Sequence, residues 1–404
     1  MSKKAATPNP VEYTYAAPST PNTGSTAHSI PHPEPISSTT YHIAGILTTV
    51  FGLSELDPST TDVAVLWLLH PRLQMQKCMA PFAAHIITDW NNNSRAKAKG
   101  KAKGKQKGLI AAAFDQRNHG TRLVDKLSNE AWRSGNERHA QDMFSCYAGT
   151  AQDTSLLLDY LSAYVFPHGE RRIVQNLVLG ISLGGHAAWH VLMHDPRFSA
   201  AVVTIGCPDY ARLMSDRARL SKRKTWLETG GREFLGSPDF PAALVDAVRR
   251  LDPAGLLWSG SGSGLDKRPG HEHGEMSQEA KEKVMPLMAR CFGNKRILNL
   301  SGGSDKLVNY AHSKPFMDWL KKAAGKGGWF EGGGLYLEDI VYPDIGHEVP
   351  PAMVDAMVRF VNETLEDERQ MDMGKLGNLR ERGRKEKVIM AFAPSIGHVR
   401  PQGS

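Results

Sequence analysis

One short motif constrains the fold of this chain more than any other stretch. The sequence GISLGG at 180–185 has Ser182 near its centre, follows the apolar residues 177–179 and precedes a segment, 184–193, that can form a helix. A serine between a strand and a helix is held in a strained conformation, with its hydroxyl at the end of the sheet. The small neighbours let strand and helix approach each other. Because a glycine-rich turn can contain a serine by chance, the rest of the chain must supply the other parts of a site.

Apolar segments and helical patterns alternate along most of the chain. Strands are expected at 63–69, 109–114, 174–179, 200–205, 297–300 and 335–342, with one or two further strands in 41–53. The first of them, VAVLWLL at 63–69, is a continuous apolar run typical of a strand covered on both faces. Helical spacing of apolar residues occurs at 79–90, 154–165, 184–193, 240–251, 311–324 and 351–365. This alternation predicts an α/β fold, with a mostly parallel, twisted sheet and helices on both faces.

Composition divides the chain into a core and its additions. Residues 1–38 are rich in Pro, Ser, Thr and Asn, a composition that cannot repay the entropy of ordering, and predict a disordered arm. The core is expected in two parts, 39–207 with a Lys-rich loop at 94–108, and 295–366. Between them, 208–294 has helical patterns and no convincing strand, and predicts a small helical lid over the site. The remaining residues, 367–404, predict a basic tail.

The positive charge of the chain is concentrated in one segment. The formal net charge is +7, and seven Lys and Arg residues lie within 95–107. They alternate with Ala and Gly, and no aromatic residue is present to stack on a base. The segment therefore predicts a solvated loop, and we expect no specific nucleic-acid partner.

The sequence also predicts where in the cell the protein is located. The first residues lack the apolar core of a signal peptide, and no run approaches the roughly 18 apolar residues that span a bilayer. We expect a soluble, cytoplasmic protein without a membrane span. The four cysteines, Cys78, Cys146, Cys207 and Cys291, match no C-x-x-C pattern and are expected to be reduced thiols. The oligomeric state does not follow from the sequence.

Two later loops supply what an active serine needs. A serine hydroxyl becomes a good nucleophile when a base takes its proton, and a carboxylate must hold that base in one tautomer. Asp305 follows the predicted strand 297–300, and His347 follows the predicted strand 335–342. Because the carboxyl ends of parallel strands gather at one edge of a sheet, we expect Ser182, Asp305 and His347 to lie close together.

Three segments resemble those of the α/β-hydrolase superfamily: the elbow GISLGG, the acid loop SGGSDKLV and the histidine segment DIGHEVPPAMVDAMVRFV. The resemblance covers residues 40–366 and is greatest to esterase-like proteins related to prolyl oligopeptidases and dienelactone hydrolases. It implies that Ser182 attacks an acyl carbonyl, that His347 accepts and returns the proton, and that Asp305 orients the imidazole. The implied enzyme needs no cofactor or metal and hydrolyses carboxylic esters or thioesters of small molecules through an acyl-enzyme.

The predicted oxyanion hole departs from the usual pattern of that superfamily. One backbone donor is the N–H after the nucleophile, here that of Leu183. The other comes from the loop at 70–73, whose Pro71 has no N–H, so the expected donor is Arg72, or Leu73 if the loop is turned. His70 in the same loop is expected to pack rather than react.

Other polar clusters have simpler interpretations. The polar turn Asp115, Arg117, Asn118 and His119 is expected to close hydrogen bonds beneath the site rather than to bind substrate. His271, Glu272, His273 and Glu275 lie in one short polar stretch and predict a solvated loop rather than a metal site. His186, on the helix after the nucleophile, is expected to pack or face solvent.

Three other functions remain open from the sequence. The same triad serves an acyltransferase whose acceptor is not water, and product analysis with competing alcohols would separate the two. A non-catalytic ligand-binding protein of this fold usually has a broken triad, whereas this one is complete. A nucleic-acid-associated role would act through residues 95–107, and their deletion would then change retention on a nucleic-acid column.

Overall fold

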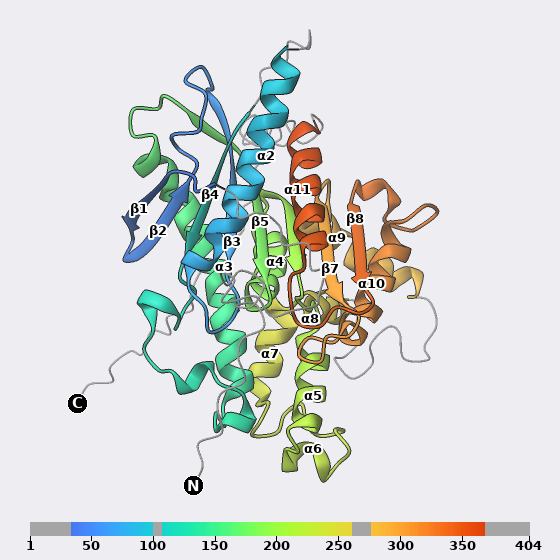
Figure 1. Cartoon of the computed structure of the whole chain (residues 1–404). Helices are drawn as coiled ribbons and strands as arrows, with labels where there is room; N and C mark the ends of the chain where they lie inside the picture. Colours follow the sequence, from blue (N-terminus) through green and yellow to red (C-terminus); the bar gives the residue numbers. More distant parts are fainter. Residues whose placement is uncertain (1–33, 100–106, 261–275, 368–404) are drawn as a thin grey trace, which may run out of the picture. The chain divides into compact units, whose positions relative to one another are not determined.

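A computed structural model describes residues 34–99, 107–260 and 276–367 of the chain. Eight strands form one sheet in the order β1-β2-β4-β3-β5-β6-β7-β8 (Figure 1). The strands are β1 Ser38–Ile43, β2 Ile46–Phe51, β3 Asp62–Leu69, β4 Gly108–Phe114, β5 Arg172–Ile181, β6 Phe198–Thr204, β7 Arg296–Gly302 and β8 Tyr336–Tyr342. Strand β2 pairs antiparallel with β1 and β4, and all other pairs are parallel.

The helices connect these strands. The α-helices are α2 Ala80–Lys99, α3 His139–Val165, α4 Leu183–His194, α5 Tyr210–Leu220, α6 Lys224–Leu227, α7 Ala242–Leu251, α8 Pro253–Gly260, α9 Gln278–Phe292, α10 Tyr310–Ala324 and α11 Pro351–Glu366. Short 3₁₀ turns are η1 Gln76–Met79, η2 Gly120–Arg122, η3 Leu127–Asn129, η4 Trp132–Ser134 and η5 Glu331–Gly333. Helices α2 and α11 lie together on one side of the sheet in Figure 1.

Strand β3 shows how the sheet is buried on both faces. Its residues alternate, so that Val65 and Trp67 pack in the core beneath α3, α4, α8, α9 and α10, while Leu66 and Leu68 pack in the core beneath α2 and α11. All four side chains are fully buried. A continuous apolar run is therefore required here rather than an alternating one, which is why the sequence predicts a central parallel strand. The predicted α/β class, with a mostly parallel sheet covered on both faces, is confirmed.

The prediction of a Lys-rich loop at 94–108 is wrong at both ends. The backbone of α2 continues to Lys99, because Ala and Lys are among the better helix-forming residues. At the other end Lys107 is buried, and its Nζ donates to Gln175 Oε1 at 2.7 Å. The carbonyl of Lys107 accepts from Trp90 Nε1 at 3.0 Å. Only residues 100–106 of the expected loop lie outside the described residues.

Two further boundaries differ from expectation. Strand β1 begins at Ser38, and Ser37 donates its backbone N–H to Glu55 Oε1 at 2.8 Å, so the last residues of the expected arm belong to the sheet edge. Residues 1–33 and 368–404, which hold the rest of the arm and the tail after Asp367, lie outside the described residues. Helix α3 begins at His139, fifteen residues before the predicted start at 154.

The insertion between β6 and β7 is helical in its described parts, 208–260 and 276–294. Its second half does not stand apart from the core. Trp258 of α8 packs edge-on against Trp319 and at a tilt against Phe316, both of α10. Met288 of α9 is buried in the same core as Trp189 of α4. These helices complete the layer over β6 and β7. Helix α5 is the part of the insertion that reaches the site described below.

Candidate active site

Ser182 lies in the sharp turn between β5 and α4. Its φ of 55° and ψ of −112° are a conformation that L-residues rarely adopt. Two backbone hydrogen bonds hold the turn: Ser182 N donates to the Thr204 carbonyl at 2.9 Å, and His186 N donates to the Ser182 carbonyl at 3.0 Å. The serine is thus held at the carboxyl end of the central strand β5, as the motif predicts.

The glycines around Ser182 are steric requirements of this turn. A Cβ on Gly180 would lie 1.9 Å from the Gly184 carbonyl oxygen, and a Cβ on Gly184 would lie 2.0 Å from the carbonyl oxygen of Leu69 on β3. Real Cβ atoms do not approach backbone atoms this closely. Gly185 is almost as confined, because its Cβ would meet the Thr204 carbonyl oxygen at 2.8 Å. The motif GISLGG therefore encodes the contact between β5, α4 and the neighbouring strands β3 and β6.

The structure brings together the three side chains that the sequence places on separate loops. Ser182 Oγ lies 2.8 Å from His347 Nε2, and His347 Nδ1 lies 2.7 Å from Asp305 Oδ2. An ionised carboxylate only accepts hydrogen bonds, so Nδ1 carries the proton and Nε2 accepts from the serine hydroxyl. Asp305 comes from the loop after β7 and His347 from the loop after β8, at the same edge of the sheet as Ser182.

Asp305 is held ionised by its surroundings. Its side chain is fully buried, and burial alone would raise its pKa. The hydrogen bond from His347 and those from the backbone N–H groups of Val308 and Leu307, at 2.9 and 2.8 Å, outweigh burial and lower the pKa of Asp305. Ser182 and the His347 side chain are 8% and 9% exposed. The nucleophile and its base thus keep a small solvent-exposed surface, while the acid has none.

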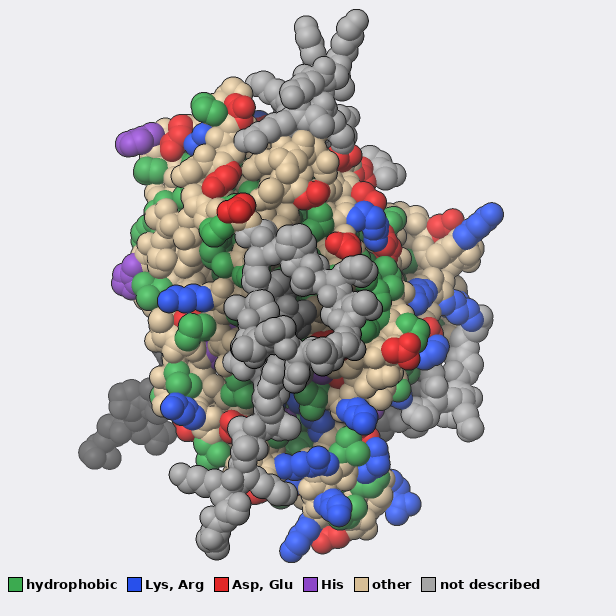
Figure 2. Space-filling model, in the orientation of Figure 1, with side chains coloured by type: hydrophobic (Ala, Val, Ile, Leu, Met, Phe, Trp, Pro, Cys, Tyr) green, Lys and Arg blue, Asp and Glu red, His purple; other side chains and the backbone are tan. Residues whose placement is uncertain are grey.

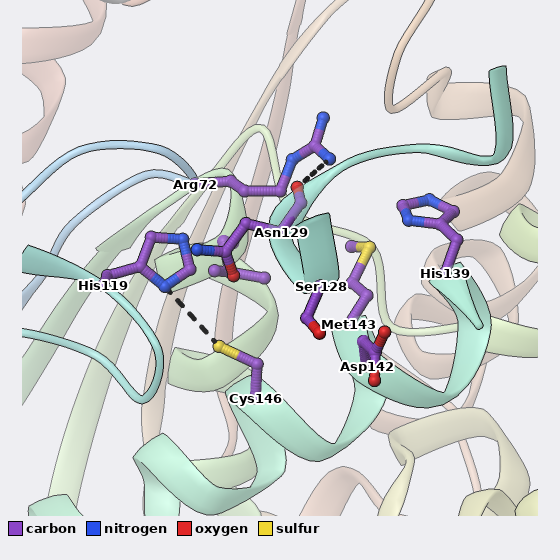
Figure 3. A pocket seen from close by; sticks show the side chains of 9 residues that line it. Arg72, His119, Ser128, Asn129, His139, Asp142, Met143 and Cys146 are labelled. Carbon is purple, nitrogen blue, oxygen red and sulfur yellow. Dashed lines mark hydrogen bonds between the residues drawn. The ribbon is translucent and has the colours of Figure 1, made fainter. Parts of the chain in front are cut away.

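A small pocket opens beside Ser182, and we call it the Arg72 pocket. Leu183, the residue after the serine, is one of its lining residues. Among the other lining residues are Arg72, His119, His139, Asp142 and Met143 (Figure 3). The two residues predicted to supply the oxyanion hole, Leu183 and Arg72, therefore border one pocket. Leu73 has a φ of 65°, so the loop at 70–73 is turned at that residue.

Residues 70–76 and 115–139, which supply Arg72, His119, Ser128, Asn129 and His139 to the lining of the pocket, are called the polar wall. Asp115 is buried and accepts from Gln76 N at 2.7 Å, from Thr121 N at 2.7 Å and from the Thr121 hydroxyl at 2.8 Å. Asn118 accepts from Val124 N and Asp125 N at 2.9 Å each. These bonds close loops, as expected of the polar turn.

The other members of the polar turn differ in position. Arg117 forms a two-pronged pair with Asp153 of α3, with N–O distances of 3.0 and 2.9 Å. His119 instead lines the Arg72 pocket, and its Nδ1 bonds the Arg117 carbonyl at 2.9 Å. The expectation of a purely structural turn thus describes Asp115, Arg117 and Asn118, whereas His119 also lines the Arg72 pocket.

Two further histidines near the serine are structural. His70 accepts from Gln116 N at 2.9 Å through Nε2, and burial lowers its pKa to about 4. His186 stacks on Tyr147 with ring centroids 5.4 Å apart, and burial lowers its pKa to about 3. Both imidazoles stay neutral and packed at ordinary pH, in agreement with the packing role that the sequence suggests.

Neither Arg217 nor His139 was predicted from the sequence to lie near the site. His139 begins α3, in a stretch where no helix was predicted, and Arg217 lies on α5. A signal was present in α5, because Arg217 falls three and four residues after the buried Met214 and Leu213, and so shares their face. A cation on the apolar face of a helix is unusual enough to mark a site.

The predicted polar loop with His271, Glu272, His273 and Glu275 lies outside the described residues. Within 34–99, 107–260 and 276–367, no group of three or more His, Cys, Asp or Glu residues could hold a metal ion. Across the same residues, no helix is long and apolar enough to cross a membrane. The four cysteines all lie in the described part and form no disulfide.

Comparison with known proteins finds similarity in structure alone. No protein-family model matches the sequence, and neither does any curated protein. The protein TT1662 from Thermus thermophilus is similar with a TM-score of 0.46 and 16% identity, over 82% of this chain and 98% of that one. An esterase from Pyrococcus furiosus has a TM-score of 0.41 and 13% identity, over 83% and 91%. Dipeptidyl peptidase 4 from Porphyromonas gingivalis has 0.42 and 11%, over 83% and 36%, so this chain spans about a third of it.

The fold follows from the chain's own architecture. In the strand order 1-2-4-3-5-6-7-8, the six strands from β4 to β8 are all parallel, and the single antiparallel strand, β2, lies between β1 and β4. Ser182, Asp305 and His347 follow β5, β7 and β8 in that chain order. With a strained serine at the turn between β5 and α4, these features give the chain the α/β-hydrolase fold.

Proposed function

We propose that this protein is a serine hydrolase that cleaves carboxylic ester or thioester bonds through an acyl-enzyme on Ser182. The observation that carries the proposal is the continuous set of hydrogen bonds from Ser182 Oγ to His347 and from His347 to Asp305, at 2.8 and 2.7 Å. Both distances are within the reach needed for proton transfer before a substrate binds.

Each residue has a defined part in the proposed reaction. His347 Nε2 takes the hydroxyl proton as Ser182 Oγ attacks the acyl carbon, and Asp305 stabilises the imidazolium that forms. The C–O or C–S bond to the leaving group then breaks, and His347 returns the proton to that group. Water, activated by the same His347, attacks the acyl-enzyme and releases the carboxylic acid and the serine.

The oxyanion of each tetrahedral intermediate needs preorganised donors. We assign this role to the backbone N–H groups of Leu183 and Arg72, because both residues border the pocket beside Ser182. Leu183 is also the first residue of α4, where the positive end of the helix dipole favours a developing negative charge. Helix α5, which reaches the pocket from the insertion, is the part of the predicted lid that we expect to shape substrate choice.

The proposal is tested by intact-protein mass spectrometry during turnover of p-nitrophenyl butyrate. We expect release of p-nitrophenol and a transient mass increase of one butyryl group, located on the peptide that contains Ser182. The variant Ser182→Ala should release p-nitrophenol no faster than the buffer does. Equal turnover by this variant and the native protein would overturn the proposal.

A further inference from the structure

Arg217 is a guanidinium without a carboxylate partner at the edge of the Arg72 pocket. Its Nη2 donates to the Leu307 carbonyl at 3.1 Å, and its Nη1 lies 3.3 Å from His139 Nε2 and 3.0 Å from Met143 Sδ. Both His139 and Met143 line the pocket. Within the described residues none of the partners of Arg217 is an acidic side chain, which is unusual for a cation on the inner face of a helix.

His139 is arranged to hold Arg217 in place without neutralising it. The Nδ1–H of His139 donates to the Glu130 carbonyl at 2.9 Å, since a carbonyl only accepts, and this leaves Nε2 as the acceptor for Arg217. Burial, together with the charges of Arg217 and Arg72, keeps the pKa of His139 well below its ordinary value. The imidazole therefore orients the guanidinium as a neutral acceptor, so the positive charge of Arg217 remains.

A second guanidinium lies close by. Arg72 lines the pocket and donates from Nη1 to the Asn129 carbonyl at 2.7 Å (Figure 3). Burial and then repulsion from Arg217 lower the pKa of Arg72 to about 10, while the charge of Glu130 acts in the opposite direction. Two like charges held together are unfavourable by themselves, and an anion between or beside them relieves the repulsion.

Two nearby carboxylates, Asp305 and Asp142, already accept hydrogen bonds from other groups, and the charges of Asp305 and Glu130 offset part of the positive charge of Arg217 and Arg72. Asp305 is taken up by His347 and by two backbone N–H groups. Asp142, which lines the pocket, accepts from Asn136 Nδ2 at 3.1 Å and lies in the first turn of α3, where the helix dipole stabilises its charge. Beyond the pocket, Lys and Arg side chains gather where α5 and α6 lie (Figure 2), with Lys222 and Lys224 exposed. Their field would steer an anion toward this side.

We infer that the substrate carries an anionic group, such as a carboxylate, that binds Arg217 and Arg72 in this pocket while its acyl carbonyl lies at Ser182. The inference rests on the proposed hydrolase function and names its substrate class: esters or thioesters with a second, negatively charged end. Arginine suits this role because its planar set of N–H donors matches a carboxylate or phosphate in two-pronged geometry.

The test compares two substrates of equal size, the mono-p-nitrophenyl ester of adipic acid and its ω-amide, with uncatalysed hydrolysis subtracted. We expect the native protein to prefer the carboxylate, and Arg217→Gln to lower kcat/KM for the carboxylate by about 10- to 100-fold, as for loss of a hydrogen bond to a charged group. In the same variant, kcat/KM for the ω-amide should change by less than about threefold, because a neutral amide loses only a weak hydrogen bond. The KM for the carboxylate should rise with salt, because ions screen the attraction.

Two controls separate charge recognition from structure. Arg219→Gln removes a cation from the same helix that is paired with Asp216, and it should leave the ratio of the two substrates unchanged. Arg217→Lys should recover part of the carboxylate preference. Arg217 also bonds the acid loop through Leu307, so a purely structural role would make Arg217→Gln lower kcat/KM equally for both substrates. That result would overturn the inference.

The outcome also distinguishes this inference from the function on which it rests. If the native protein hydrolyses the ω-amide as well as the carboxylate and Ser182 becomes acylated, the hydrolase function holds and the anionic substrate class is wrong. If neither substrate is cleaved and Ser182 also fails to react with a fluorophosphonate, the hydrolase function itself fails.

Discussion

The elbow and the polar wall both border the Arg72 pocket, but they are built by different means. At the elbow, backbone contacts leave no room for side chains, so glycines at 180 and 184 are required. On the polar wall, side chains such as Asp115 and Asn118 hold the loops by bonding to backbone N–H groups. The first kind of construction leaves a spacing motif in the sequence. The second depends on side-chain hydrogen bonds between residues six or more positions apart and leaves no fixed spacing in the sequence.

The largest difference between the two sides should appear in catalysis. His347→Ala removes the base that bonds Ser182, and we expect kcat for ester hydrolysis to fall on the order of 10⁴-fold, as for loss of a triad member. His119→Ala, on the polar wall, should keep most of the activity. Steady-state kinetics with p-nitrophenyl butyrate, beside circular dichroism to check folding, makes the comparison. Equal losses in the two variants would mean that the base has been misassigned.

Stability should reveal the steric nature of the elbow. In Gly184→Ala the new Cβ would lie 2.0 Å from a backbone oxygen of β3, and we expect the free energy of unfolding to fall by about 4 kcal/mol or more, or the protein not to fold. Gly332→Ala is the matched control, because no atom lies within 4 Å of its added Cβ. Urea unfolding of both variants measures the difference. A Gly184→Ala protein as stable as the control would contradict the packing of α4 on β3.

The polar wall should be sensitive to the loss of acceptors rather than to added atoms. Asp115→Ala would leave three donors, on Gln76 and Thr121, without their acceptor. We expect a loss of about 2–3 kcal/mol in the free energy of unfolding. Asp246→Ala, on the exposed face of α7, should change it by less than about 0.5 kcal/mol. If Asp115→Ala proved neutral in urea unfolding, the wall would be held by something other than this carboxylate.

The smallest expected effect is on how the free energy of unfolding depends on pH. His186, beneath the elbow, has its pKa lowered by burial from 6.5 to about 3. A neutral folded histidine contributes its full stability above pH 6.5, and the contribution is lost as pH falls from 6.5 toward 3, because the unfolded chain takes up the proton first. Each such histidine should cost about 1.4 kcal/mol per pH unit in that window. Urea unfolding at pH 7 and pH 5 should show a smaller pH dependence for His186→Gln than for the native protein. An unchanged dependence would refute the burial of a neutral His186.

The same contrast explains how much could be predicted from the sequence. The parallel core was predictable because its strands, such as β3 and β4, are apolar on both faces and their apolar runs are too short for a typical buried helix. Ser182, Asp305 and His347 were found because each directly follows a strand, and parallel strands bring their carboxyl ends together. Local sequence order is sufficient for both inferences.

What the sequence did not reveal depends on long-range contacts. The first half of α3, from His139, has polar residues that pack against α5 and the polar wall, so its helical period is obscured. The neighbours of Lys107 in the sequence are polar, charged or small. Its burial depends on a hydrogen bond to Gln175 of β5, and β3 lies between β5 and β4 in the sheet. The role inferred for Arg217 likewise rests on His139 and Leu307, each more than seventy residues distant in the chain.

The central claim is that Ser182 is an activated nucleophile, and a fluorophosphonate probe tests it without knowledge of the substrate. The native protein should form a stable adduct at neutral pH, with the modified residue mapped to Ser182 by mass spectrometry. Ser182→Ala should not be labelled, and His347→Ala should be labelled far more slowly. No adduct on the native protein, or equal labelling of Ser182→Ala, would contradict the account.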